Sequence, residues 1–288
     1  MKYFSEREYG ERPRTEEEIP HAVWGGIVAL VEELVTRGAF GQSFPEECPD
    51  GQGIIGTNDR TLSLSIQAEI PGFSFPLNAD EIPDNLALFD FLEFCHYHVA
   101  EPIEGGYHSF YRHTHLSFTS GGQERFRERI NRIFRRNGLA YELREDGQVE
   151  RLAPPVIQEA LSGSIFKSGD SKLDELLETA RIKFLNPNPQ IRREALEKLW
   201  DAWERIKTVE PGKGKRDSAL VILNKAATET NFRALLEKEA RELTEIGNRF
   251  HIRHSEKDQV PLESDNYVDY LFHRLFAMIT LLLRRKSK

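Results

Sequence analysis

The stretch AYELREDGQVERLAPP, residues 140–155, combines a hairpin signal with a point where regular structure is interrupted. Asp146-Gly147 supplies residues that tolerate positive φ angles at a tight turn, so the flanking segments are expected to pair as a β-hairpin. Pro154-Pro155 follows directly, and neither proline can continue a strand ladder or a helix interior. The stretch therefore predicts a hairpin that is followed by a boundary in the chain.

The sequence differs in pattern and in charge on the two sides of this boundary. Helical and strand-like segments alternate before it, whereas nearly every later segment has the apolar periodicity of a helix. We therefore expect an α+β domain at residues 1–154, followed by an all-α helical bundle at residues 155–288. The formal net charge of −8 divides into −11 for the first domain and +3 for the second, so the acidic character belongs to the first domain.

The composition is that of an ordinary globular chain. Of its 288 residues, 39% are hydrophobic and 30% are charged, which excludes disorder for most of the length. A net charge of −8 argues against a non-specific polyanion-binding protein, because such binding needs an excess of Lys and Arg. The mildly basic second domain still permits selective recognition of RNA.

Cysteine content and hydropathy bear on the compartment. Cys48 and Cys95 are the only cysteines, too few for a disulfide framework or for a zinc site built on cysteines. A reducing compartment is the simplest interpretation. The apolar run nearest in length to a membrane span, residues 276–283, is far shorter than the ~20 residues required. We therefore expect a cytoplasmic protein that does not associate with membranes.

Apolar spacing predicts the main elements of the first domain. Helical spacing favours helices at residues 20–37, 82–99 and 123–137. The alternation in LSLSIQ, residues 62–67, is typical of a half-buried strand, and HLSFTS, residues 115–120, is expected to form a second strand.

Helix-start signals predict the helices of the second domain. Ser171 and Asp174 resemble a capping box, and Asn188-Pro189 supplies an N-cap followed by proline at the first helical position. The remaining expected helical segments are residues 217–253, with a break near Thr230-Asn231, and residues 265–285.

One short segment, GNRFHIRHSE at residues 247–256, concentrates groups suited to RNA chemistry. Arg249 can donate two hydrogen bonds to a phosphate, and His254 can transfer protons near neutral pH. Cleavage of RNA by its own 2′-hydroxyl needs both functions. On one continuous helix these side chains would point ~140° apart, so a shared site requires the helix to end between them. The plain alternative is that these cations only stabilise a helix end.

The motif and several longer blocks of sequence each resemble a known family. The spacing Arg249-x4-His254 on a helical bundle resembles the R-x4-6-H signature of the HEPN superfamily, whose catalytic members are metal-independent ribonucleases. Most of the chain also looks like AbiJ-type abortive-infection proteins, in which an amino-terminal accessory domain precedes a HEPN domain. The blocks that carry this second resemblance are KYFSEREYG, EFCHYHVAEPIEGGYHSFYRHTHLSF, GQERFRERINRIFRRNGLAYELREDGQVERL and EKLWDAWERIKT.

The resemblance implies a function and a mechanism. It implies a metal-independent HEPN endoribonuclease that acts as a toxin or effector in antiphage defence, without a cofactor. RNA, with tRNA as one candidate, would be cleaved to 2′,3′-cyclic phosphate and 5′-hydroxyl ends. A homodimer through the helical domain would bring two copies of Arg249 and His254 to one cleft. A phage trigger or a defence-system partner would activate it.

Phe250 departs from the family pattern, in which the residue after the motif arginine is usually polar. This departure makes Arg253 a rival for the catalytic or substrate-binding arginine. It also leaves an alternative function, a non-catalytic HEPN dimer that serves as a nucleic-acid- or protein-binding regulatory module. Asn248 beside the motif, and Glu204 and Arg205 on the helix expected to face it, are candidates for supporting the site.

An arginine stripe marks the helix expected at residues 123–137. Its members recur at helical spacing and could hold RNA phosphates or the acidic surface of a partner. The alternative is a solvated face whose arginines pair with nearby acids. The stripe consists of Arg125, Arg129, Arg132 and Arg136.

Five of the nine histidines lie within twenty residues of one another. Imidazole and carboxylate groups both bind zinc, so a zinc site is one interpretation of this cluster. The absence of an HExxH spacing and the many aromatic neighbours favour a polar cluster packed among rings. The cluster comprises His96, His98, His108, His113 and His115, with Glu93 and Cys95 beside it.

Overall fold

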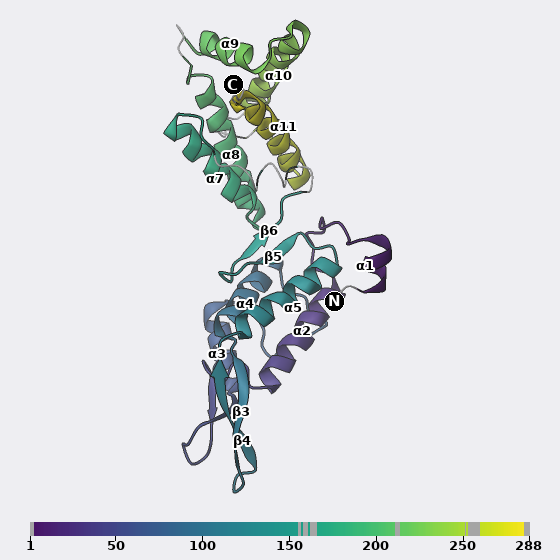
Figure 1. Ribbon diagram of the computed structural model, residues 1–288, viewed down its shortest axis with the longest axis vertical. Helices are drawn as coiled ribbons and strands as arrows, with labels where there is room; N and C mark the ends of the chain where they lie inside the picture. Colours follow the sequence, from purple (N-terminus) through teal and green to yellow (C-terminus); the bar gives the residue numbers. More distant parts are fainter. Residues whose placement is uncertain are drawn as a thin grey trace. The chain divides into compact units, whose positions relative to one another are not determined.

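The computed structural model divides into two compact units, Met1–Pro154 and Pro155–Lys288 (Figure 1). The first unit combines helices with strands, and the described part of the second unit is helical. The predicted α+β region followed by an all-α region is therefore confirmed. The residues that the structure describes are 3–154, 157, 161, 166–210, 214–250, 252 and 260–284.

The first unit contains helices α1 to α5 and strands β1 to β6. A four-stranded antiparallel sheet has the order β1-β2-β4-β3, and β5 pairs with β6 in a separate hairpin. The helices are α1 (Phe4–Tyr9), α2 (His21–Thr36), α3 (Asp59–Glu69), α4 (Asn85–His98) and α5 (Gly122–Arg136). The strands are β1 (Pro45–Glu47), β2 (Ile54–Thr57), β3 (Glu101–His108), β4 (His113–Thr119), β5 (Tyr141–Leu143) and β6 (Val149–Arg151).

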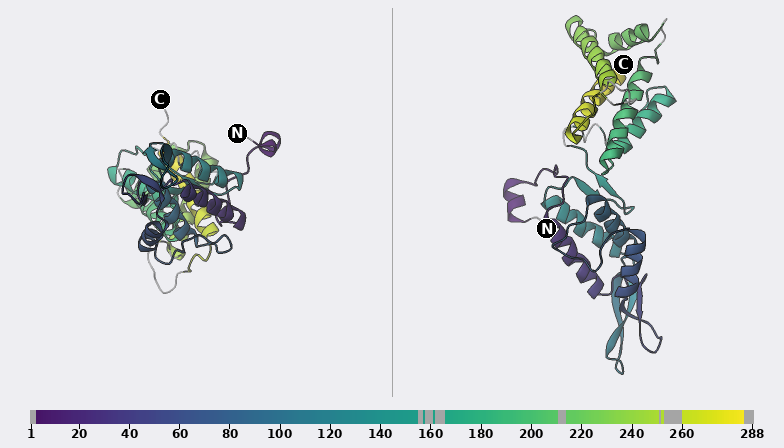
Figure 2. Two further views of the ribbon diagram at one scale, coloured as in Figure 1. Left: turned by 90° about the horizontal axis from the view of Figure 1, so that it is seen from below. Right: turned by 180° about the vertical axis from the view of Figure 1, so that it is seen from behind.

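The core of the first unit is formed mainly by α2, α4 and α5. Ile27 on α2, Phe91 on α4 and Ile130 on α5 are fully buried, and burial of each such side chain stabilises the fold by about 1.5–3 kcal/mol. The β3–β4 hairpin extends away from these helices in both the front and the back views (Figures 1 and 2). The hairpin therefore gains little from the core that holds the helices together.

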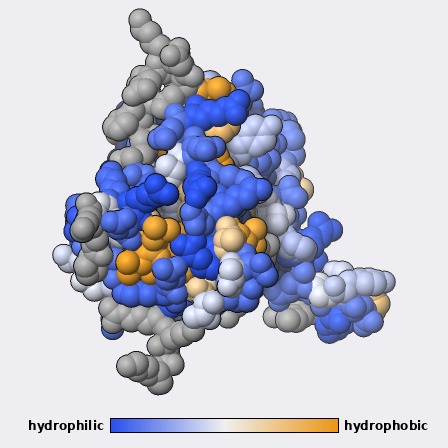
Figure 3. Space-filling view, turned by 90° about the horizontal axis from the view of Figure 1, so that it is seen from above, coloured by the Kyte–Doolittle hydropathy of each residue, from blue (hydrophilic) through white to orange (hydrophobic). Residues whose placement is uncertain are grey.

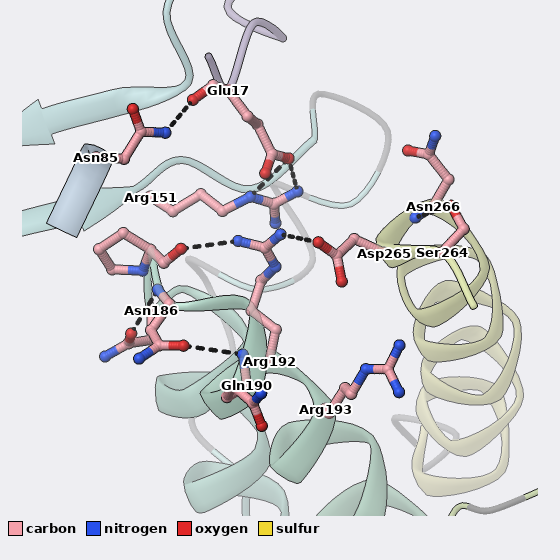
Figure 4. A network of polar contacts seen from close by, with 12 residues as sticks. Glu17, Asn85, Arg151, Asn186, Gln190, Arg192, Arg193, Ser264, Asp265 and Asn266 are labelled. Atoms are coloured by element: carbon pink, nitrogen blue, oxygen red, sulfur yellow. Dashed lines mark hydrogen bonds and ion pairs between the residues drawn. The ribbon is translucent and has the colours of Figure 1, made fainter. Parts of the chain in front are cut away.

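The predicted Asp-Gly hairpin is confirmed as β5 and β6. Gly147 has a φ of +86°, and a Cβ at this position would lie 2.5 Å from Nδ1 of His96, so glycine is needed for both angle and space. The buried Arg151 guanidinium donates from Nε and Nη2 to Oε1 of Glu17 at 3.0 and 2.5 Å (Figure 4). This contact ties β6 to the segment that precedes α2.

The strand predicted for LSLSIQ is wrong, because this segment belongs to α3. The side chain of Asn58 caps the helix by accepting a hydrogen bond from the backbone N–H of Thr61 at 3.0 Å. Leu62 and Ile66, one helical turn apart, are buried, whereas Leu64 between them is 57% exposed. The apolar positions fit both the two-residue period of a strand and the 3.6-residue period of a helix. The Asn58 cap and the burial of one face favour the helix.

The other predicted elements of the first unit are confirmed, and α1, β1, β2 and β3 were missed. β1 and β2 have only 3 and 4 residues, and β3 contains Gly105-Gly106 at an irregularity of its register with β4. Short or glycine-containing strands lack the clean alternation that sequence reasoning detects. The confirmed elements are the helices predicted at 20–37, 82–99 and 123–137, found as α2, α4 and α5, and the strand at 115–120, which overlaps β4.

The described part of the second unit consists of helices. α7 and α8 form a hairpin, and α11 packs against α8. No helix of the described segments combines the length and the apolar character needed to cross a membrane. The predicted break near Thr230 is found just before that residue. The helices are α7 (Ser171–Phe184), α8 (Pro189–Ile206), α9 (Lys215–Ala226), α10 (Thr230–Arg249) and α11 (Asp265–Leu283).

Side-chain caps begin the first two of these helices. Asp170, not Ser171, is the N-cap of α7, and its carboxylate accepts a hydrogen bond from the N–H of Leu173 at 2.8 Å. The predicted capping box was therefore placed one residue too late. Asn188 caps α8 as predicted, since its side chain accepts from the N–H of Gln190 at 2.9 Å.

Aromatic stacking and one buried arginine hold the helices of the second unit together. Phe184 of α7 stacks on Phe272 of α11, with ring centroids 3.8 Å apart. Arg192 of α8 is 1% exposed, donates to the carbonyl oxygen of Pro187 at 3.0 Å and pairs with Asp265 at 3.6 Å (Figure 4). Arg192 thus joins α8 to the first residue of α11.

Candidate functional site

The end of α10 carries the arginine of the predicted RNA-cleaving motif. Arg249 is the last residue of the helix, and Phe250 then adopts an extended backbone with φ −98° and ψ 154°. The N–H of Val260 donates to the carbonyl oxygen of Arg249 at 3.1 Å, so Val260 lies against the helix end. A site shared by Arg249 and a residue five positions later requires the helix to end between them, and α10 ends directly after Arg249.

Two tryptophans of α8 hold this part of α10 in place. Nε1 of Trp200 donates to the carbonyl oxygen of Leu243, and Nε1 of Trp203 donates to Oγ1 of Thr244, both at 3.2 Å. The indole of Trp200 also covers Gly247, where a Cβ would lie only 2.1 Å from Nε1. The carboxy-terminal end of α10 is therefore fixed against α8 by close packing and by hydrogen bonds.

The Arg249 side chain is exposed. It makes no ion pair with any other residue that the structure describes. Its charge lies at the negative end of the α10 dipole, which stabilises a cation there whether or not RNA binds. Asn248 is also exposed. The other motif residues, Arg253 and His254, lie outside the described residues.

The two residues expected to support the motif from α8 have other partners. Arg205 donates two hydrogen bonds to Asp170, at 3.2 and 2.6 Å, and the pKa of Asp170 is lowered mainly by these bonds. Glu204 forms ion pairs with Lys207 and, at 3.6 Å, with Lys215. These contacts brace the helical unit and, in the described part of the chain, do not connect either residue to Arg249.

The first half of the arginine stripe on α5 is paired with acids from other elements. Arg125 lies 2.5 Å from Glu101 at the start of β3. Arg129 donates two hydrogen bonds to Glu33 of α2, at 2.9 and 2.6 Å, and these bonds are the main reason that the pKa of Glu33 is lowered. Both arginines thus link α5 to its neighbours.

The second half of the stripe contacts α1 and the residue before it. Arg132 donates to the hydroxyl of Tyr3 at 2.8 Å, and Arg136 pairs with Glu6 at 3.1 Å. Both guanidinium groups also lie over the Tyr3 ring, at 5.2 and 4.1 Å from its centroid. All four arginines therefore have partners within their own unit, which favours the paired-surface interpretation over an RNA-binding stripe.

A cysteine and three histidines meet near the tip of the β3–β4 hairpin. Cys48, His108, His113 and His115 each offer a ligand atom, and these atoms all lie within 4.8 Å of one another. Sγ of Cys48 is 3.2 Å from Nε2 of His113 and 3.7 Å from Nδ1 of His108. The cysteine is buried, which raises its pKa, and the histidines are half-buried. This group could hold a metal ion.

Strand register explains why these side chains gather. His108 and His113 are cross-strand partners beside the turn of the hairpin, and His115, two residues after His113, lies on the same face of the strand. Cys48 begins the turn between β1 and β2, where its N–H donates to the carbonyl oxygen of Gly53 at 3.0 Å. Because β2 pairs with β4, this turn is brought to the hairpin.

The remaining members of the predicted histidine cluster belong to α4 and do not join this group. The ring of His98 packs against Phe44 and Phe94, with centroids 4.8 and 4.5 Å away. Burial is the main reason that the pKa values of His96 and His98 are lowered and that of Cys95 is raised. The predicted packing among aromatic rings is therefore found for His98.

Cys48 was not predicted as a member of the cluster. The expectation drawn from two cysteines concerned sites built on several cysteines, and it does not cover one cysteine with three histidines. Cys48 and His108 are 60 positions apart, so no short motif contains both. The turn sequence PDGQG at residues 49–53 was a signal that a strand ends close to Cys48.

A pocket of about 590 Å³ lies among α8, α9, α10 and α11. Its walls combine apolar side chains such as Trp203 and Leu282 with cations such as Lys215 and Arg241. The face of the molecule drawn in Figure 3 carries hydrophobic patches that lie among hydrophilic side chains. Arg249 and the other described members of the predicted RNA site do not line this pocket.

Comparison with known proteins identifies the first unit. A family model described as AbiJ N-terminal domain 4 matches residues 2–167, which is more than half of the chain. The matched region includes both the arginine stripe and the cysteine-histidine cluster. No curated protein and no solved structure matches the chain.

Proposed function

Because the chain belongs to the AbiJ N-terminal domain 4 family, which suggests a role in abortive-infection defence, we propose that its second unit is a metal-independent endoribonuclease of the HEPN type. In this proposal residues 1–154 are an accessory or sensor domain, and residues 155–288 carry the catalytic motif. A phage-derived trigger or a defence-system partner activates cleavage, and the loss of RNA arrests growth of the infected cell.

The end of α10 is the observation that supports this activity best. Arg249 is exposed at the last position of the helix, and the chain leaves the helical path at Phe250. An exposed guanidinium in this position is available to bind a phosphate through two hydrogen bonds. His254 follows five residues later in the sequence, and because α10 ends at Arg249 the helical separation of ~140° does not constrain this pair.

The proposed reaction is a transesterification. Arg249 binds the scissile phosphate and stabilises the negative charge that accumulates on it. The 2′-hydroxyl oxygen attacks the phosphorus as its proton passes to a base, and the bond to the 5′-oxygen breaks as that oxygen receives a proton. The products carry 2′,3′-cyclic phosphate and 5′-hydroxyl ends.

Dimerisation would complete this chemistry. One His254 cannot act as base and acid in the same encounter, whereas a twofold dimer supplies a second copy of Arg249 and His254. We therefore expect a homodimer through the helical unit. The helical unit, residues 155–288, has a net charge of +3. This charge is too small for strong non-specific binding of RNA, which favours a selected substrate, with tRNA as one candidate.

The test is cleavage of total RNA by the purified full-length protein in the presence of EDTA, with and without extract from phage-infected cells. We expect cleavage to survive chelation and to leave 2′,3′-cyclic phosphate ends. Arg249→Ala and His254→Ala are each expected to reduce the rate by about 10²-fold or more, because each removes a group that acts in the transition state. Fragment ends and rates are read from end-labelled RNA.

Arg241→Ala is the matched control for this experiment. Arg241 is an exposed arginine of the same helix, and its ion pair with Glu237 has no part in the proposed reaction. We expect this variant to cleave RNA at the wild-type rate. Cleavage that requires a divalent metal, or that is unaffected by loss of either Arg249 or His254, would contradict the proposed mechanism.

A non-catalytic HEPN dimer is the alternative, and two observations favour it. The apolar Phe250 follows Arg249, and Arg249 already has a stabilising role at the negative end of the helix dipole. A scaffold of this kind would bind RNA or a protein partner without cutting it. Gel-shift binding of RNA that remains intact under activating conditions would support this alternative over the enzyme.

A further inference from the structure

The cysteine-histidine cluster has the composition of a four-coordinate metal site. We propose that Cys48, His108, His113 and His115 bind one Zn²⁺ ion and that the ion fastens the β3–β4 hairpin to the turn between β1 and β2. The cluster lies within the matched region, but the description of that family names no metal site, and the proposed RNA chemistry does not use one. The proposal depends on the first unit alone.

The distances within the cluster suit a tetrahedral zinc ion. With zinc about 2.3 Å from sulfur and about 2.0–2.1 Å from nitrogen, sulfur and nitrogen ligands lie about 3.6 Å apart. Sγ of Cys48 lies 3.2 Å from Nε2 of His113 and 3.7 Å from Nδ1 of His108, on either side of that value. The three histidine rings are mutually equidistant, with centroids 5.5 to 5.6 Å apart, as expected for rings directed at one point.

The donor set selects the kind of metal. A thiolate and three imidazoles suit zinc and related transition metals, whereas calcium and magnesium prefer oxygen ligands. Four protein ligands complete the tetrahedral coordination of zinc and leave no position for a substrate, which is the pattern of structural sites. We therefore infer a structural role for the ion and no part in hydrolysis.

Groups around the cluster fit the outer shell of a metal site. While Nδ1 of His108 faces the cysteine, its Nε2 lies 3.6 Å from the Asp50 carboxylate, as in the carboxylate-histidine-metal arrangement that orients a ligand ring. Asp50 is itself held by the N–H of Gln52 at 2.9 Å. Nε2 of His115 is buried and has no hydrogen-bond partner among the described residues. A metal ion coordinated by this nitrogen would give it a partner.

The hairpin needs a source of stability other than apolar burial. None of the residues of β3 and β4 is fully buried, and the hairpin extends beyond the helices of its unit (Figure 1). Only one residue pair, Ile54 and Leu116, connects β2 to the hairpin in the sheet register, and strands without a fully buried face are marginally stable, whereas a bound metal contributes its binding free energy to the folded state. The cluster joins Cys48 of the first turn to three ligands of the hairpin, so one ion would hold both segments.

The first measurement is the metal content of the full-length protein, purified without chelators and without nickel affinity chromatography. We expect about one zinc per chain by inductively coupled plasma mass spectrometry. Cys48→Ser and His113→Ala should each reduce the zinc content or the affinity at least about tenfold, and Asp50→Asn should weaken binding by about 10- to 100-fold through the outer shell. His21→Ala is the control, because His21 is exposed on α2 and should leave the zinc content unchanged.

Cobalt substitution separates ligation from a loss of folding. Protein loaded with Co²⁺ should show the visible bands of a tetrahedral ion together with a sulfur-to-cobalt charge-transfer band. In Cys48→His the charge-transfer band should disappear while the tetrahedral bands remain, which a misfolded variant would not show. Hydrogen exchange should be faster in residues 101–119 after zinc is removed, with the core of α4 unchanged.

Two results would overturn the proposal. One is a folded wild-type protein that holds no zinc after incubation with zinc and desalting. The other is zinc that is bound equally by the wild type, Cys48→Ser and His113→Ala. Both depend on metal content and not on RNA cleavage, so they leave the proposed ribonuclease activity to its own test.

Discussion

Gly247 allows α10 to approach α8 closely enough for Trp200 to bond the helix backbone. A Cβ at this position would lie 2.1 Å from Nε1 of Trp200, and the indole is 1% exposed, so it has little room to move. Alanine favours a helix over glycine by about 1 kcal/mol, but overpacking of a core costs about 1–3 kcal/mol. We expect Gly247→Ala to lower the free energy of unfolding, measured by denaturant titration, and to reduce RNA cleavage by displacing Arg249.

Gly25→Ala provides the comparison within another helix. A Cβ at Gly25 of α2 would meet no heavy atom within 4 Å, so the higher helix propensity of alanine should act alone and stabilise the protein by about 0.5–1 kcal/mol. Opposite signs for the two substitutions would separate packing from propensity. A Gly247→Ala variant that is as stable as the wild type would show that Trp200 does not pack on α10 in this way.

Prediction of the elements from the sequence depended on how many local signals agreed. Asn188 caps α8 and precedes a proline and a helical apolar pattern, and Asp146-Gly147 forms the β5–β6 turn between two apolar runs. By contrast, Leu62 and Ile66 fit either a strand or a helix, and the choice depends on the Asn58 cap and on the surface that the rest of the unit buries. Strand β3 was missed because cross-strand pairing with β4 compensates for its two glycines.

The carboxy-terminal half of α4 should make the stability of the first unit depend on pH. The pKa values of His96 and His98 are lowered, mainly by burial, and Glu69 opposes this effect only in part at His98. The unfolded chain therefore takes up protons more readily, so stability present above about pH 6.5 is lost as the pH falls through the pKa values of the folded state. We expect the melting temperature to fall between about pH 7.5 and 5.5.

His98→Phe should reduce this pH dependence. A phenyl ring can occupy the space that His98 shares with Phe44 and Phe94, and it cannot take up a proton. The decrease in melting temperature on acidification should be smaller than in the wild type, while His21→Ala should show the wild-type decrease. An equal decrease in His98→Phe and the wild type would mean that other groups cause the pH dependence.

The candidate sites differ in how far the sequence alone could define them. Arg249 and His254 lie in one short motif, so their pairing could be proposed before any fold was known. The cysteine-histidine cluster instead depends on the sheet order β1-β2-β4-β3, which brings Cys48 to three histidines that are at least 60 positions away. Local sequence contains the hairpin histidines but not this tertiary arrangement, because strand order is set by packing of the whole unit.

The two compact units provide the last prediction, which concerns the boundary between them. Residues 1–154 contain their own core and the complete cysteine-histidine cluster, whereas the family match continues to residue 167. We expect a fragment of residues 1–154 to fold, to retain zinc and to unfold in one cooperative transition, because every described residue of its hydrophobic core precedes Pro154.

Calorimetry of the fragments and of the full chain checks this expectation. The full chain should show two transitions, of which one matches the fragment 1–154 and the other matches a fragment of residues 155–288. If residues 1–167 fold but residues 1–154 do not, the segment after Pro154 contributes to the first unit, and the family boundary describes the domain better than the change in sequence pattern does. A single transition of the full chain, with both fragments unfolded, would mean that the two units depend on each other for stability.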